Sequence, residues 1–322
     1  AFGRRRAMVS SFASYLISFI MIYFLQDFFF LAFAMVMFAF GEAFRTGTHK
    51  ALILEYLKLN EISDLKVAYY GLTRSASQLG SAFNALIAAG LAFYTGSYRV
   101  MFLAAVIPYV LDLLNLASYP AELDGDIPGV KKDEIWPRLR GTFRGFVGIF
   151  KDRNVFTILL NSASFAAFFK SSKDYLQPIL ATLALSVVFI GSLNETRREA
   201  LVIGLVYFCI YMLTSLASRR AYYLSDRFRN LSQAVNWTYL AGGILLILAG
   251  LTATFQIRII AIFSFLMLFL LTNVRRPIHV GLISDKINNN VMASGLSAET
   301  QLTSILSAAI APILGYLVDN LG

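Results

Sequence analysis

Long apolar segments, separated by short polar loops, constrain this chain more than any other feature. An α-helix of about 20 apolar residues is long enough to cross the ~30 Å hydrocarbon core of a bilayer. No segment is dominated by strict alternation of apolar and polar residues, which a membrane β-barrel would require. The sequence therefore predicts an all-α membrane protein, a polytopic helical bundle with about nine transmembrane helices. The segments cover residues 7–25, 28–57, 67–94, 98–119, 153–185, 198–219, 231–253, 257–285 and 291–318.

The distribution of charge predicts how these helices are oriented. Charged residues make up only 15% of the chain and apolar residues 57%, a balance that excludes an ordinary soluble domain. The net charge of +9 comes mainly from alternate loops, and the positive-inside bias places those loops in the cytoplasm. We therefore expect a multi-pass protein of the plasma membrane whose positive charge faces lipid headgroups rather than nucleic acid.

An internal repeat is marked by the two histidines. Residues 45–55 contain Arg45, His49, Leu-Ile and Glu55, and residues 275–285 contain Arg275, His279, Leu-Ile and an acid in the same register. Each copy ends a long apolar segment. The following segments then share a Gly-Leu pair, at residues 71–72 and 295–296. These matches predict two related halves.

Residues 120–152 form the longest stretch outside the predicted spans. The first part is polar and rich in turn-forming residues, which is typical of a loop. The second part, 134–151, mixes Trp and Phe with Arg, a composition that favours a helix lying in the membrane interface. We expect this stretch to be a cytoplasmic linker between two membrane halves.

Two loop motifs show a resemblance to the major facilitator superfamily of secondary transporters. The loop between the second and third helices of that family has the form Gly-x-x-x-Asp-x-x-Gly-Arg-(Arg/Lys). Gly3-Arg4-Arg5 resembles the end of this motif, and residues 222–229, which include Asp226 and Arg227, resemble its counterpart in the second half. The second copy departs from the pattern, because Tyr222 and Arg229 stand where glycines are usual.

The resemblance implies an organisation and a function. It assigns residues 1–119 to helices three to six of the family, 120–152 to the linker and 153–322 to helices seven to eleven, so the first two helices and the last one are expected to be missing. It implies a monomeric transporter that moves a small solute by alternating access, either coupled to protons or not. It implies no enzymatic activity and no cofactor.

Polar side chains on three of the predicted spans are candidates for a solute or ion cavity. The spacing of Glu42, Arg45 and His49 places them on one helix face, where Glu42 and Arg45 can pair. By resemblance, the three spans correspond to helices that line a central cavity. Each set has the alternative of structural pairs between helices, and the histidines could simply hydrogen-bond a neighbouring helix instead of carrying protons. The other candidates are Lys170, Lys173, Asp174 and Gln177, expected on one face of the fifth span, and Arg275, Arg276 and His279, expected on one face of the eighth.

A second group of residues is expected at the cytoplasmic ends of the helices. By resemblance, an acid at the end of a span pairs with loop-motif arginines and holds that side shut. Glu55 would then face Arg4 or Arg5, and Asp285 would face Arg227, with Asp226 beside it. A solvated acid at a helix end is the alternative, although a carboxylate there is disfavoured by the helix macrodipole.

Two other function classes remain as alternatives. The imperfect second loop motif is compatible with a relative that senses or scaffolds without transporting. A membrane-embedded enzyme lacks support, since the chain has no HExxH pattern and no paired-aspartate motif for a metal-bound diphosphate. The single cysteine, Cys209, lies inside an apolar segment and is expected to be a plain apolar side chain. The sequence predicts no metal site.

Overall fold

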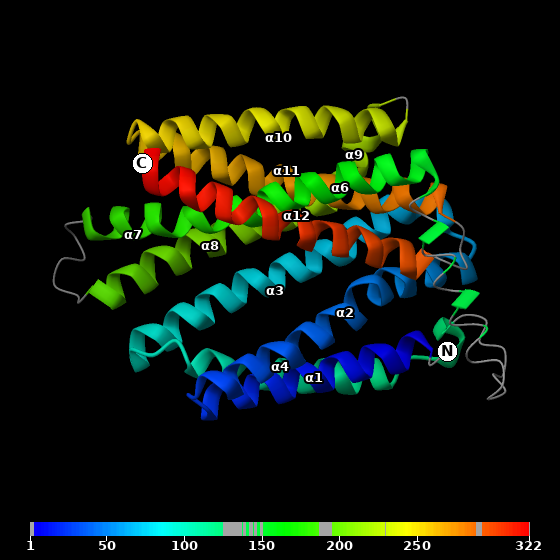
Figure 1. Cartoon of the computed structure of the whole chain (residues 1–322), viewed down its shortest axis with the longest axis horizontal. Coiled ribbons are helices and arrows are strands. Elements are labelled where there is room, and N and C mark those ends of the chain that lie inside the picture. Colours follow the sequence, from blue (N-terminus) through cyan, green and yellow to red (C-terminus); the bar gives the residue numbers. More distant parts are fainter. Residues whose placement is uncertain are drawn as a thin grey trace. The chain divides into compact units, whose positions relative to one another are not determined.

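In a computed structural model, the described residues of the chain form helices joined by short loops and turns. These residues are 3–124, 137, 140–141, 144, 147–148, 151–186, 195–228, 230–287 and 292–321. Within them, nine helices are long and apolar enough to cross a membrane, as the sequence predicts. Figure 1 shows the helices along the chain. They are α1 (Arg4–Phe24), α2 (Phe28–Leu59), α3 (Lys66–Thr95), α4 (Val100–Ala117), α6 (Arg153–Ser172), α7 (Leu176–Ser186), α8 (Glu195–Arg219), α9 (Ala221–Asp226), α10 (Leu231–Thr254), α11 (Arg258–Lys286) and α12 (Met292–Leu321), with short 3₁₀ turns η1 (Ser63–Leu65), η2 (Ala121–Asp124) and η4 (Lys173–Tyr175).

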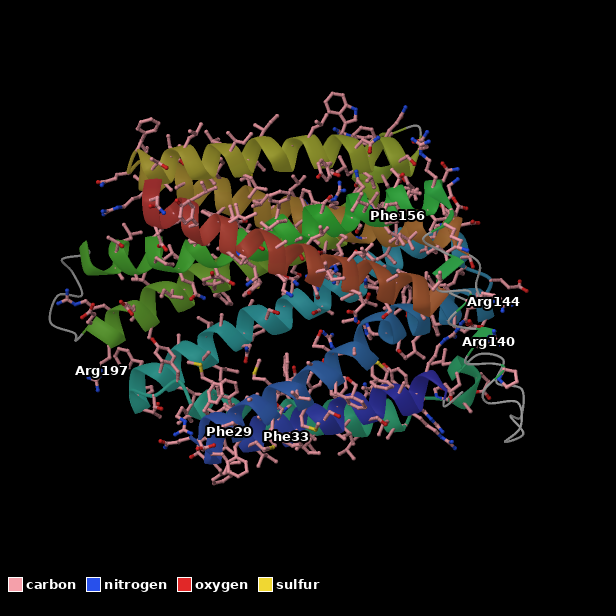
Figure 2. All side chains as sticks on the ribbon, in the orientation of Figure 1. Phe29, Phe33, Arg140, Arg144, Phe156 and Arg197 are labelled. Atoms are coloured by element: carbon pink, nitrogen blue, oxygen red, sulfur yellow. The ribbon has the colours of Figure 1, made fainter. Side chains whose placement is uncertain are left out.

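The surface of the helices is apolar in the way that hydrocarbon requires. Large apolar side chains point outward along whole helices, and Figure 2 labels Phe29 and Phe33 near the start of α2, which are 79% and 51% exposed. In water, such extended apolar surfaces would drive association. A bilayer accepts them, while the helices satisfy their backbone polar groups internally.

The first compact unit contains residues 1–63, 97–156 and 286–300. Here α1 packs against both α2 and α4, as Figure 1 also shows. The buried core of this unit consists of apolar and aromatic side chains from these helices, chiefly Met8, Phe12, Tyr15, Phe19, Leu52 and Leu116. The first turns of α12 also belong to this unit.

The second compact unit contains residues 64–96, 157–285 and 301–322. Within it, α3 packs along α8. The backbones approach so closely that a Cβ atom on Gly71 would lie 2.5 Å from the carbonyl oxygen of Ser218. Small residues at helix interfaces permit this approach in membranes, where van der Waals packing has to replace the hydrophobic effect.

The two units divide the chain differently from the two expected halves. The sequence assigns α3 to the first half, but α3 clusters with the later helices because of its packing on α8. The expected halves describe an internal repeat, which stays a prediction. Most of the expected interfacial helix, 134–151, lies outside the described residues. The described positions Arg140 and Arg144 are helical and exposed, and Figure 2 labels both.

The predicted span 153–185 is not one continuous α-helix. It consists of α6 and α7, joined by the 3₁₀ turn η4 at Lys173–Tyr175. A 3₁₀ turn winds the chain more tightly than an α-helix, so side chains beyond it rotate away from the face that α-helical spacing predicts. This change affects the candidate residues of the span directly.

Candidate functional site

A polar cluster lies halfway along α1 and α2, at Tyr15, Glu42 and Arg45. The Tyr15 hydroxyl donates to Glu42 Oε1 over 2.5 Å. Arg45 donates to the same carboxylate oxygen from Nη2 over 2.8 Å and to the Tyr15 hydroxyl from Nε over 3.0 Å. The pairing of Glu42 with Arg45 expected from their spacing is therefore present.

The packing around Tyr15 holds this cluster in place. Tyr15 is 1% exposed, and its ring contacts those of Phe38 and Tyr109 at centroid distances of 5.1 and 5.5 Å. Beside Glu42, the two helices are also pinned at Gly41, whose carbonyl accepts a 2.6 Å hydrogen bond from Ser11. A Cβ atom at Gly41 would lie 2.9 Å from the Ser11 carbonyl oxygen, so the close approach requires glycine.

The charged ends of the cluster remain accessible. The side chains of Arg45 and Glu42 are 40% and 36% exposed, whereas Tyr15 is covered. A charge near the centre of a bilayer costs roughly 2.5–3.5 kcal/mol if it faces lipid. A partly exposed ion pair at this depth therefore indicates a wet surface, and ionisable groups in such positions are candidates for ligand contact.

His49, two turns from Glu42, is exposed, and the residue after it is not. Lys50 is buried and pairs with Glu299 of α12 over 2.9 Å, with side-chain exposures of 6% and 14%. The sequence marks Lys50 as a charge inside a span but gives no sign of its partner, which is 249 residues away. The sequence shows only that Glu299 is an acid within another predicted span, and this does not identify it as the partner of Lys50.

One end of α2 is tied to the start of α1. Arg4 donates to Glu55 over 2.9 Å, as the loop-motif resemblance predicts. Arg5 does not share this contact: its side chain donates to the carbonyl oxygen of Tyr119 over 2.9 Å, and its backbone N–H donates to Asp124 over 2.6 Å. Both arginines thus fix the start of α1, but only Arg4 pairs with the acid.

The corresponding contact in the second unit differs from the prediction. Asp285 pairs with Lys66 rather than with Arg227. Lys66 opens α3, and α3 starts beside the end of α11, where a Cβ atom on Gly281 would meet Val67 at 2.8 Å. Asp226 and Arg227, at the end of α9, are both exposed. The expected pairing is wrong because α3 supplies a nearer cation.

The fifth-span candidates do not share one face. Asp174 pairs with its neighbour Lys173 instead of lying one α-helical turn from Lys170. The reason is the η4 turn, which includes both residues of the pair. Lys170 and Gln177 are exposed on either side of it. Although Gln177 is exposed, its side chain hydrogen-bonds Tyr207 of α8.

The eighth-span candidates also separate. Arg275 and His279 are buried, at 2% and 3% exposure, while Arg276 is exposed. Arg275 binds within the second unit, to the Thr238 hydroxyl over 2.7 Å and to Val235 and Asn161. Its guanidinium also lies 4.5 Å from the centre of the Phe165 ring, a cation–π contact. Arg275 thus connects α6, α10 and α11, which is the structural alternative left open above.

The described residues include no group of three or more His, Cys, Asp or Glu side chains that could hold a metal ion. A family model described as Major Facilitator Superfamily matches residues 1–312, which is nearly the whole chain. None of the curated proteins compared with the chain matches it significantly.

Proposed function

Since the chain belongs to the major facilitator superfamily, and is therefore a multi-pass membrane transporter of the general kind that carries small solutes, we propose that it works by alternating access. In this mechanism the solute site opens to one side of the membrane and then to the other. We place the site at the mid-span cluster of Tyr15, Glu42 and Arg45. The observation that carries the proposal is the accessible ion pair of Glu42 and Arg45 halfway along α2.

The geometry of the cluster supports proton coupling through Glu42. The hydrogen bonds that Tyr15 and Arg45 donate to Glu42 reach one oxygen, Oε1. A proton on Glu42 would remove the charge that holds Arg45 and would leave the guanidinium ready for an anionic group of the solute. Loss of that proton would restore the ion pair and expel the anion. Proton uptake and solute binding would then favour each other.

The ion pairs at the helix ends fit a gate on the cytoplasmic side. Arg4 with Glu55, and Lys66 with Asp285, each join two helices at the end where the basic loops occur. We propose that these pairs, together with Arg5, Asp226 and Arg227, stabilise a state closed toward the cytoplasm. We also propose that the linker 120–152 is cytoplasmic and that the protein is a monomer of the plasma membrane.

Transport assays in proteoliposomes test the proposal. Radiolabelled organic anions and zwitterions are supplied outside vesicles that hold the purified protein, with and without an inward proton gradient. We expect accumulation driven by the gradient, and at least tenfold slower accumulation for Glu42→Gln and Arg45→Gln. Glu61→Gln, in an exposed turn after α2, serves as the matched control and should leave the rate unchanged. Full activity of Glu42→Gln in gradient-driven uptake would reject Glu42 as the coupling residue.

A further inference from the structure

A cavity of about 610 Å³ lies in the first unit, at the end where α1 begins. Its walls come from the first two turns of α1, from α2 and from the last residue of α4. In Figure 1, α1 runs beside both of the other helices. The volume falls within the range of roughly 300–1,000 Å³ that is usual for ligand sites. No residue of the mid-span cluster is among the described residues that line it.

One wall of this cavity is apolar. Phe40 and Phe44 occupy successive turns of α2, with ring centroids 4.6 Å apart, and they are 47% and 39% exposed. Val9 of α1 extends the wall. The hydrogen bond between Ser11 and Gly41 fixes α2 against α1 at this level, so the ring pair lies beside the first turns of α1. Such a wall offers van der Waals contact to a hydrocarbon chain.

The other end of the cavity is positively charged. Arg5 and Arg6 line it, and its described lining residues include no acid. Arg6 is exposed and makes no hydrogen bond or ion pair with another described residue. The Arg5 guanidinium donates to the carbonyl oxygen of Tyr119, a neutral acceptor. Asp124 accepts the backbone N–H of Arg5. Counting this acid, two guanidinium groups against one carboxylate still leave one net positive charge, which favours an anion.

We infer that this cavity binds an anionic phospholipid. The phosphate would contact the guanidinium groups of Arg5 and Arg6, and an acyl chain would run over the rings of Phe40 and Phe44. Arg6 and Ser10 both line the cavity, one helical turn or about 6 Å apart along the axis, so the charged end passes directly into the apolar wall. Basic pockets between membrane helices on the cytoplasmic side are suited to anionic headgroups.

The amphiphilic lining selects a lipid over other anions. A soluble phosphate compound would use only the charged end, and a zwitterionic lipid would bring no net charge to it. The inference goes beyond the proposed function, because it concerns a partner of the protein in the membrane and not the transported solute. Binding can therefore be measured without any assay of transport.

Native mass spectrometry of the purified, delipidated chain tests the inference, since each bound molecule adds its own mass. The probes are dioctanoyl phosphatidylglycerol, which is anionic, dioctanoyl phosphatidylcholine, which has the same chains but no net charge, and glycerol phosphate, which has no chains. We expect the anionic lipid to bind about tenfold more tightly than the zwitterionic one. Equal affinity for the two lipids, or glycerol phosphate binding as tightly as the anionic lipid, would overturn the assignment.

An arginine variant locates the headgroup. Arg6→Gln removes an exposed charge and should weaken the binding of phosphatidylglycerol about fivefold, with no change for phosphatidylcholine. The matched control is Arg220→Gln, an exposed arginine in another basic loop and outside the cavity, which should bind both lipids like the unchanged chain. Because Arg6 has no partner among the described residues, its replacement should leave the fold intact. Unchanged affinity of Arg6→Gln for phosphatidylglycerol would reject the inference.

A phenylalanine variant locates the acyl chain. Phe44→Ala removes half of the ring pair and should weaken the binding of both lipids severalfold, because both carry the same chains. Phe33→Ala, on the same helix and 51% exposed, lies outside the described lining and should change neither affinity. Equal losses in the two variants would mean that the lipid coats α2 without occupying the cavity.

Photo-crosslinking in the cell membrane identifies the natural occupant. Phe44→benzoylphenylalanine carries the reactive ketone in the cavity, and Trp237→benzoylphenylalanine carries it near the start of α10, at a side chain that is 63% exposed. Mass spectrometry of the irradiated protein should show anionic phospholipid enriched at position 44 relative to position 237. The same mixture of lipids at both positions, or a crosslink from position 44 to a polypeptide segment, would contradict a selective lipid site.

Discussion

Tyr15 shows how one hydroxyl group can organise a charged pair inside a membrane protein. The hydroxyl donates its single proton to Glu42 and accepts a hydrogen bond from Arg45, so both charges are held by one buried atom. Its ring is packed among other aromatic rings and has little freedom. The chemistry of the pair belongs to Glu42 and Arg45, whereas their positions depend on a residue that carries no charge.

The buried pair of Lys50 and Glu299 yields a prediction at the residue scale. Lys50→Met removes the cation that pairs with the Glu299 carboxylate, whose side chain is only 14% exposed, and we expect a loss of about 3 kcal/mol in the free energy of unfolding. Lys50→Met combined with Glu299→Met should recover most of that loss, because two apolar side chains replace the ion pair. Denaturant titration of the purified protein, analysed as a double-mutant cycle, measures the coupling.

The exposed pair of Lys58 and Glu55 supplies the control for this cycle. Lys58 Nζ lies 3.9 Å from Glu55 Oε1, and its side chain is 56% exposed. An ion pair so open to solvent contributes little, so Lys58→Met should change the free energy of unfolding by less than about 0.5 kcal/mol. A Lys50→Met variant as stable as Lys58→Met would show that the buried pair is not formed in the folded protein.

At the scale of helices, the α3–α8 pair depends on the absence of side chains. Besides the contact at Gly71, a Cβ atom on Gly204 would lie 2.3 Å from the Cβ of Ala89. Polar side chains then lock the two backbones where they touch, as Ser75 with Ser215 over 2.8 Å and Gln78 with Thr214 over 3.0 Å. Close packing and internal hydrogen bonds are what hold helices together in lipid.

Two glycines of α3 test this explanation. Gly71→Ala places a Cβ atom against the Ser218 backbone, which cannot move aside as a flexible side chain can, and should cost about 1–3 kcal/mol of stability. Gly80→Ala, in the same helix, meets nothing within 4 Å and should stabilise the protein by about 0.5–1 kcal/mol, because alanine favours the helix. Thermal unfolding of both variants gives the comparison. Equal effects of the two substitutions would contradict the close contact.

At the scale of the molecule, the orientation of the spans is the property that every functional proposal uses. The chain has one cysteine, so a Cys209→Ala background accepts single new cysteines. Glu61→Cys and Tyr98→Cys lie in the turns at opposite ends of α3. We expect a membrane-impermeant maleimide to label position 98 in intact cells and position 61 only after permeabilisation.

The pattern of labelling distinguishes each failure. Labelling of position 61 but not of position 98 in intact cells would reverse the orientation, and with it the cytoplasmic gate. Labelling of both positions from one side would mean that α3 does not cross the membrane. The Cys209→Ala background alone supplies the control and should remain unlabelled under both conditions.

The family, and the nine candidate spans found in the described part of the chain, were predictable from the sequence. Apolar length alone decides whether a segment can cross a bilayer, and lipid forces the backbone of a crossing segment into a helix. Local spacing also predicts the pair of Glu42 and Arg45, because residues three positions apart meet on any α-helix. The loop motif also predicts that Glu55 meets Arg4 or Arg5, and the structure shows that Arg4 is its partner.

Contacts between segments far apart in sequence were decided only by the tertiary structure. Helical periodicity indicates which residues share a face, but it does not tell which helix lies opposite. Asp285 therefore pairs with Lys66 instead of Arg227, and Lys50 pairs with Glu299. Helical periodicity fails even locally where a 3₁₀ turn interrupts the α-helix, as at Lys173–Tyr175. There Asp174 pairs with Lys173 and not with Lys170. The sequence determined which segments cross the membrane, and packing determined which of their charges meet.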